Sequence, residues 1–300
     1  NATSDSFTFN GGLTTTSVGG TVTLNGTIAT SNDAIVFGAV TLGSNTIVDT
    51  NATDGTGDIT IAAVTGGNNT LTLTTENNIA GADITASGAI AGVTTLTLAN
   101  VGGTATLSAD VDVTTLSVNN TVANVVFTGN GSSVVNAVAF ANDGTLTLGQ
   151  DGGTQTYNGG LTTTSVGGTV TLNGTIATSN DAIVFGAVTL GANTIVDTNA
   201  TNGTGDITLA AVTGGNNTLT LTTENNIAGA DVTASGAIAG VTTLTLASVG
   251  GTATLSADVD VTTLSVNNTV ANVVFTGNGS SVVNAVAFAN DGTLTLGQDG

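Results

Sequence analysis

The chain repeats itself after 148 residues, and this repetition limits the folds open to it more than any other feature. The stretch that begins at Asn10 returns almost letter for letter at Asn158. A repeated sequence indicates identical modules in series, so we predict two repeat units, 1–152 and 153–300. From Asn10 to Gly152 the copies differ only by mild exchanges, at Ser44/Ala192, Asp54/Asn202, Ile61/Leu209, Ile84/Val232 and Asn100/Ser248.

Within each copy, short triplets of the form apolar–threonine–apolar alternate with small polar turns. Leu71-Thr72-Leu73 and Leu96-Thr97-Leu98 are typical, and Gly or Asn residues separate such triplets. Alternation at two residues with β-branched side chains predicts strands. Gly and Asn accept the positive φ angles that tight turns need. No sustained helical pattern is present, so we predict an all-β chain without helices.

The triplets form two families that recur about every 21 residues within the 148-residue repeat. The first family is Val22–Leu24, Val40–Leu42, Ile59–Ile61, Asp83–Thr85, Ala105–Leu107, Val125–Phe127 and Leu146–Leu148. The second family is Leu71–Leu73, Leu96–Leu98, Leu116–Val118, Val138–Phe140 and Gln155–Tyr157, with Ile47–Asp49 as an earlier member.

Two or three short strands in each rung of about 21 residues predict a parallel β-helix, or β-solenoid, because one rung cannot bury its inward side chains alone. The alternative is two tandem β-sandwich domains, since short alternating strands with frequent turns fit that fold as well. The chain has no Trp, no Pro and no linker between the copies. These absences, together with a repeat finer than a domain, favour the solenoid.

The composition excludes several functional classes. Lys, Arg, His, Cys, Met, Trp and Pro are all absent, and the formal net charge is −20. Without Cys or His there is no disulfide framework and no ordinary zinc, haem or iron–sulfur site. An acidic chain without basic side chains repels nucleic acid, so we predict no nucleic-acid partner. The apolar runs are far shorter than a spanning helix requires, so we also predict no membrane insertion.

The sequence resembles a known group of bacterial proteins. The run from Thr154 to Gly160 and the stretch from Gly186 to Thr223 are similar to the glycine-, threonine- and asparagine-rich repeats of giant bacterial surface proteins, of the filamentous-haemagglutinin and β-strand-repeat type. The resemblance implies a secreted, cell-surface adhesin or extracellular fibre protein with a right-handed β-helical stalk. The chain departs from the usual pattern because it has no basic residue.

Repeated aspartates are candidate calcium ligands. The Asp-Val-Asp triplets place two carboxylates about 7 Å apart on one face of a strand, and the Gly-Thr-Gly-Asp turns resemble calcium-binding turns. The alternatives are solvated outer-face carboxylates for the triplets and simple turn formers for the Gly-rich segments. Asp54 becomes Asn202 in the second copy, which argues against a strictly repeated site. The candidates are Asp54, Asp58, Asp110, Asp112, Asp206, Asp258 and Asp260.

Phe7 and Phe9 are candidate assembly residues, because the two copies diverge most at this N-terminal segment. The strand that carries them would dock on a neighbouring molecule; alternatively it is the end of an upstream unit. The abundant Asn residues predict amide ladders at the corners of the rungs.

No Arg, Lys or His accompanies the acidic residues to hold a substrate, so we do not expect an enzyme. We predict a structural extracellular β-solenoid that forms a stalk, filament or surface-layer fibre with an adhesive or cell-contact role. Its partners would be further copies, joined end to end or laterally, and a surface glycan. The alternative is a glycan- or calcium-binding adhesin module.

Overall fold

A computed structural model describes residues 5–297. These residues form an all-β structure without helices, in which parallel strands stack in coils of about 21 residues per turn, about 14 turns in all. The prediction of a β-solenoid is therefore confirmed, and the parallel pairing excludes the β-sandwich alternative. The coils belong to two compact units. The first unit comprises the residues up to Thr147 together with Ser165–Gly168, and the second comprises Leu148–Thr164 and the residues from Thr169 onward. Residues 5–297 contain no helix that could cross a membrane.

The strands are short, except where one strand continues around a corner of the coil. The strands up to the boundary of the first unit are β1 (Ser6–Phe9), β2 (Leu13–Thr14), β3 (Val22–Thr30), β4 (Ile35–Asp49), β5 (Ile59–Thr65), β6 (Thr70–Thr74), β7 (Ile84–Ala86), β8 (Ile90–Ala99), β9 (Val101–Leu107), β10 (Val111–Val118), β11 (Val122–Phe127), β12 (Ser133–Val134), β13 (Val138–Ala139) and β14 (Leu146–Leu148). The second unit continues with β15 (Thr154–Tyr157), β16 (Leu161–Thr162), β17 (Val170–Ala177), β18 (Ile183–Phe185), β19 (Val188–Asp197), β20 (Ile207–Leu209), β21 (Val212–Thr213), β22 (Thr218–Thr222), β23 (Val232–Ala234), β24 (Ile238–Ala247), β25 (Thr252–Leu255), β26 (Val259–Val266), β27 (Asn272–Phe275), β28 (Ser281–Val282) and β29 (Leu294–Leu296).

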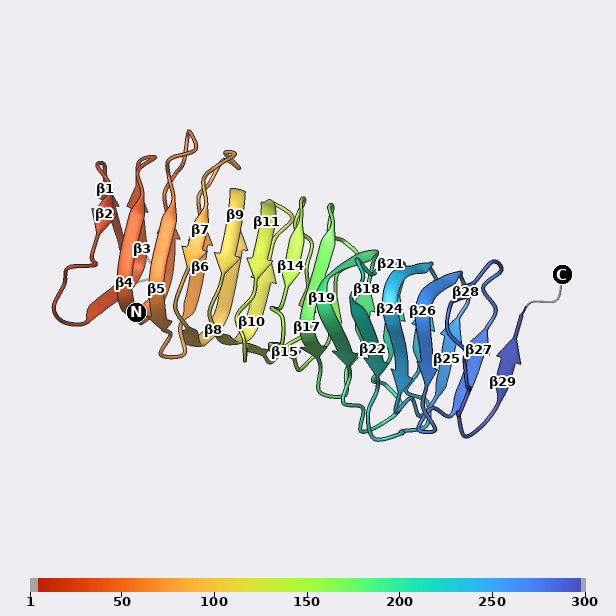
Figure 1. Cartoon of the computed structure of the whole chain (residues 1–300). Coiled ribbons are helices and arrows are strands. Elements are labelled where there is room, and N and C mark those ends of the chain that lie inside the picture. The colour runs from red at the N-terminus through yellow and green to blue at the C-terminus, as the bar shows by residue number, and fades with distance from the viewer. Residues whose placement is uncertain (1–4, 298–300) are drawn as a thin grey trace. The chain divides into compact units, whose positions relative to one another are not determined.

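In the first unit the strands of successive coils lie side by side (Figure 1). Their pairing arranges them in three stacks, which we call the first, second and third faces. The first face stacks β2, the start of β4, the start of β5, β7, β9 and β11. The second face stacks the starts of β3, β8 and β10 with the middle of β4, the end of β5 and β12. The third face stacks β1, the ends of β3, β4, β8 and β10, and β6.

The second unit has corresponding faces. Its first face stacks β16, β18, β20, β23, β25, β27 and β29. Its second face stacks the starts of β17, β19, β24 and β26 with β21 and β28. Its third face stacks β15, the ends of β17, β19, β24 and β26, and β22.

Three members of the second predicted family of triplets are confirmed in the first unit. Leu71, Leu96 and Leu116 follow one another in register on the third face. The end of β4, which carries Ile47, precedes them as predicted.

The first predicted family is wrong in one respect, because it joins two faces. Val22 pairs with Val40 as predicted, but Val40 then pairs with Val64 on the second face. Ile59 instead pairs with Ile35 on the first face. The physical reason is that β4 is a strand of 15 residues that passes through all three faces, and its first segment lacks the apolar–threonine–apolar pattern.

Each unit buries a continuous column of aliphatic side chains under every face. On the first face, Ile35, Ile59, Ile84 and Ala105 are fully buried one above another. Outward positions between them carry mainly Thr, so the period-two pattern reflects an inside and an outside. Two exchanges between the copies fall in this core, at Ile61 and Ile84, and both retain an apolar side chain.

The corners of the coils use Asn in two ways. Asn51, Asn77 and Asn100 adopt positive φ, as the turn chemistry predicts. The side-chain amides of Asn51 and Asn77 bond backbone carbonyls in place of the predicted side-chain ladders: Asn51 donates through Nδ2 to the Thr30 carbonyl of the neighbouring coil, 21 residues away, and Asn77 donates to the Ala52 carbonyl. The side chains bond the neighbouring backbone because it presents carbonyls and N–H groups that would otherwise lack partners at a corner.

Candidate functional site

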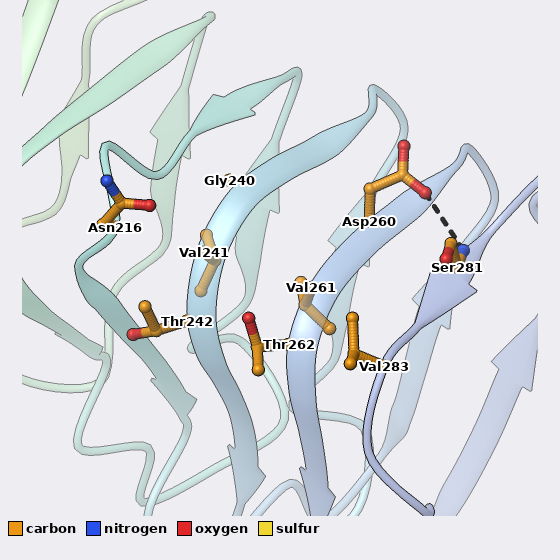
Figure 2. A pocket seen from close by; sticks show the side chains of 9 residues that line it. All are labelled: Asn216, Gly240, Val241, Thr242, Asp260, Val261, Thr262, Ser281 and Val283. Atoms are coloured by element: carbon orange, nitrogen blue, oxygen red, sulfur yellow. Dashed lines mark hydrogen bonds between the residues drawn. The ribbon is translucent and has the colours of Figure 1, made fainter.

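The second unit carries a groove of about 340 Å³ on the surface of β24 and β26. Figure 2 shows Thr242 on β24 and Thr262 on β26 beside each other, with Asp260 hydrogen-bonded to Ser281 nearby. We call this hollow the bulge groove. Its lining is Asn216, Gly240, Val241, Thr242, Asp260, Val261, Thr262, Ser281 and Val283.

A β-bulge shapes the groove. The pairing of β24 with β26 shifts register between Ala239 and Val241, so Gly240 is the extra residue on its strand. Gly240 has a φ of 70°, which glycine adopts without strain. Because glycine has no side chain, the bulge leaves a hollow between the neighbouring side chains.

The first unit carries the same groove, with a volume of about 300 Å³. Gly92 is the extra residue here, with a φ of 69°. The lining residues correspond one to one with those of the second unit: Asn68, Gly92, Val93, Thr94, Asp112, Val113, Thr114, Ser133 and Val135. The sequence patterns did not predict the groove, although an isolated Gly inside a strand pattern is the usual signal of a bulge.

The groove combines one carboxylate with several hydroxyl groups and exposed apolar surface. Val283 is 75% exposed, whereas Val241 and Val261 point into the core. The hydroxyls can donate and accept hydrogen bonds, and the carboxylate can only accept them. This chemistry suits a neutral ligand rich in hydroxyl groups.

Of the predicted Asp-Val-Asp candidates, Asp112 and Asp260 belong to the lining of the two grooves, whereas Asp110 and Asp258 do not. Asp112 is exposed on β10, and its Oδ1 accepts a hydrogen bond of 3.1 Å from the Ser133 backbone N–H. Asp110 precedes β10, and its backbone carbonyl accepts the Ile90 N–H at 2.9 Å. The bond that Asp112 accepts recurs at Asp260, and the bond that Asp110 accepts recurs at Asp258.

Asp58 belongs to a chain of carboxylates on the first face that sequence reasoning did not predict. Asp58 Oδ1 accepts the Asp83 N–H at 2.9 Å, and Asp83 Oδ1 accepts the Thr104 N–H at 2.7 Å. Asp206 and Asp231 repeat the arrangement in the second unit. These carboxylates therefore join one coil to the next.

Asp54 lies in an exposed turn. Its Oδ1 accepts bonds of 2.6 Å from the Thr56 hydroxyl and 3.0 Å from the Thr56 N–H, and the hydroxyl bond is the main reason that the pKa of Asp54 is lowered. Asn202 accepts the same two bonds in the second unit, from Thr204. The turn therefore does not depend on a negative charge.

The seven candidate calcium ligands do not converge. Among the described residues, no group of three or more acidic side chains lies close enough to hold a metal ion. Calcium binding at these positions stays a prediction.

Two buried aspartates were not among the predicted sites. Asp49, at the end of β4, is 8% exposed, and burial raises its pKa from 3.8 to about 6. A hydrogen bond from the Asn51 N–H lowers this pKa, and the nearby Glu76 raises it. Asp197 repeats the arrangement beside Glu224, and burial raises its pKa to about 6 as well. The signal in the sequence is an acid that directly follows an apolar strand run.

The candidate assembly residues are exposed. Phe7 and Phe9 on β1 are 55% and 39% exposed, while β1 pairs along one edge with the end of β3. At the position of Phe7, the second copy has Gln155, which is buried and accepts a hydrogen bond of 3.0 Å from Tyr157. The two copies therefore differ in burial at this position: Phe7 is exposed in the first copy, and Gln155 is buried in the second.

Comparisons with protein-family models, with curated proteins and with solved structures found no match. The fold therefore defines the chain as a β-solenoid repeat protein and assigns it to no family.

The carboxylate chain on the first face gives a testable expectation. Replacing Asp83 and Asp231 by Ala removes the acceptors of the Thr104 and Thr252 N–H groups. Each unpartnered N–H costs about 1 kcal/mol, so we expect a lower urea midpoint. Asp→Asn at both positions is the control, since it keeps Oδ1 and should cost less. Equal midpoints for the Ala and Asn variants would contradict this role.

Proposed function

We propose that the chain is a non-enzymatic structural protein outside a bacterial cell, part of a stalk, filament or surface-layer fibre with a cell-contact role. The observation that carries the proposal is the use of polar side chains for stacking. Asn32, Asn45, Asp83 and Asn124 each bind the backbone of a neighbouring coil. Their principal contacts therefore hold one coil on the next, which is the task of a structural solenoid.

The composition supports a location outside the cell. With no Lys or Arg, the chain offers no cleavage site to trypsin-like proteases. Its stability does not depend on disulfides or on ordinary metal centres, because it has no Cys and no His. The resemblance to giant bacterial surface proteins favours the same location.

Self-association is the second part of the proposal. β1 carries exposed Phe7 and Phe9, and at the other end of the described chain Leu294 and Leu296 are 40% and 58% exposed. Their counterparts Leu146 and Leu148 are fully buried. Contact between such apolar surfaces of two copies would remove them from water.

Electron microscopy of the purified chain tests the proposal. We expect regular fibres whose diffraction shows a coil spacing of about 4.8 Å along the fibre axis. Phe7→Ser/Phe9→Ser should reduce assembly, while Ile195→Ser, which also changes an exposed apolar residue, should not. Compact separate particles at all concentrations would contradict a fibre role.

The duplicated bulge groove favours a second candidate, a glycan-binding module. The groove offers the carboxylate of Asp112, the hydroxyls of Thr94 and Thr114, and a valine surface, and the second unit repeats all of them. Titration with neutral oligosaccharides should show saturable binding that Thr114→Ala/Thr262→Ala abolishes. Absence of binding across a broad set of neutral glycans would remove this candidate.

A further inference from the structure

The third face of each unit carries an ordered set of hydroxyl groups, which we call the threonine array. In the first unit, Thr70 pairs with Thr95 and Thr72 pairs with Thr97 across β6 and β8. On β10, Thr115 and Ser117 continue the two columns without a register shift. The second unit repeats the array: Thr218, Thr243 and Thr263 form one column, and Thr220, Thr245 and Ser265 form the other.

Side-chain packing fixes the direction of the array. Leu71, Leu96 and Leu116 alternate with the threonines and are buried, so the threonines point to solvent. β-Branched side chains on a strand have few χ1 rotamers. The hydroxyl and methyl groups of the threonines in each column are therefore held in a repeated orientation.

Most hydroxyls of the array remain available to a ligand. Thr30, Thr50 and Thr75, at the coil corners, donate to backbone carbonyls. In the described structure, the hydroxyls of Thr72 and Thr97 make no hydrogen bond with the protein. At the last strand of each array the hydroxyls are hydrogen-bonded: Thr115 and Thr263 each accept a bond from an Asn side chain, and Ser117 and Ser265 each donate one. The array threonines on β6 and β8, and those on β22 and β24, therefore offer a block of unbonded hydroxyls beside methyl groups.

Charge distinguishes the array from the first face. Strand β6 and the segments Thr95–Ala99 and Thr115–Val118 contain no acidic residue. On the first face, by contrast, Asp58 and Asp83 flank the outward threonines. A carboxylate keeps a tightly bound hydration shell, which disturbs any ordered layer of water beside it.

We propose that the threonine array binds ice. The columns repeat at about 4.8 Å from coil to coil and about 6.6 Å along a strand, and the oxygen rows on the prism faces of hexagonal ice have nearly the same two spacings. The methyl groups would order water between the columns, and the hydroxyls would anchor that water to the crystal. The array lacks the aromatic platforms that suit the flat faces of crystalline polysaccharides, so ice fits it better.

The growth of single ice crystals in solutions of the full chain tests this inference. We expect faceted crystals and a freezing point below the melting point. Thr97→Lys/Thr245→Lys should abolish both effects, because each substitution places a charged chain in the centre of an array. Thr85→Lys/Thr233→Lys is the matched control on the first face and should retain both. Circular dichroism would verify that each variant folds.

Three results would overturn the inference: round crystals with the unaltered chain, equal loss of activity in both lysine variants, or binding to microcrystalline cellulose without an effect on ice. If Thr97→Lys/Thr245→Lys fails to fold, the isosteric Thr97→Val/Thr245→Val replaces it. Weaker ice shaping by the valine variant would then support the role of the hydroxyls, and unchanged shaping would refute it. None of these outcomes depends on fibre formation, so the inference stands or falls separately from the proposed structural role.

Discussion

Replacing Gly66 and Gly214 by Ala is expected to destabilise both units strongly. An added Cβ at Gly66 would overlap the backbone of Gly92 and Val93 in the next coil, and one at Gly214 would overlap the backbone of Gly240 and Val241. Backbone atoms held in a parallel ladder cannot move aside without loss of hydrogen bonds, here those that join Gly66 to Ala91 and Asn68 to Gly92. Overpacking of this kind costs about 1–3 kcal/mol per site, which urea unfolding would detect.

Gly19 and Gly20 provide the matched control. A Cβ at either position meets no atom within 4 Å, and neither glycine has a positive φ. Gly19→Ala/Gly20→Ala should therefore keep the wild-type midpoint or raise it slightly, because alanine restricts the unfolded chain more than glycine does. If the two double variants lose the same stability, close coil contact at Gly66 is not the cause.

The chain is expected to become more stable as the pH falls from about 7 to about 4. The pKa of Asp49 and that of Asp197 are raised from 3.8 to about 6 in the folded state. Over this range the folded chain takes up two protons that the unfolded chain does not yet bind, so unfolding costs more at the lower pH. After allowance for solvent screening, each site contributes about 1–2 kcal/mol. Thermal melts at a series of pH values measure the effect.

Asp49→Asn/Asp197→Asn isolates the two sites from the rest of the acidic chain. At pH 7.5 the Asn variant should melt at a higher temperature than the wild type, because it buries no charge. Near pH 4 the difference should vanish, since the wild-type carboxyls are then protonated. Asp33→Asn/Asp181→Asn, in the loops before Ile35 and Ile183, removes the same charge and should keep the wild-type pH dependence. A less stable Asn variant at pH 7.5 would refute this account.

Most of the fold could be predicted because local rules agree along the chain. Alternation in triplets such as Leu71-Thr72-Leu73 requires a strand with one buried side, and Asn and Gly at the corners allow the sharp turns between strands. The second family of triplets was right for three of its members because Leu71, Leu96 and Leu116 share one pattern and one face. The first family was wrong where Ile35–Phe37 lacked that pattern, and β4 continued around a corner.

The candidate sites could be predicted less well. Sequence spacing suggested a local carboxylate pair at Asp110 and Asp112, but the carboxylate of Asp112 bonds the backbone of a residue 21 positions away. Bonds of this kind depend on which residue of the next coil lies opposite, and coil length varies along the chain. The bulge at Gly92 and the burial of Asp49 depend on the same stacking register.

The sequence by itself determined the class of structure: a repeated, all-β solenoid with Gly and Asn corners, without disulfides and with a large negative charge. These properties follow from the local periodicity of the sequence and from its overall composition, and neither depends on which coil residues lie opposite one another. Only the tertiary structure decided which strands share a face, where the bulge opens a groove, which aspartates are buried, and where threonines align in two columns. Each of these depends on the register between coils, and register is set by the packing of residues roughly 21 positions apart.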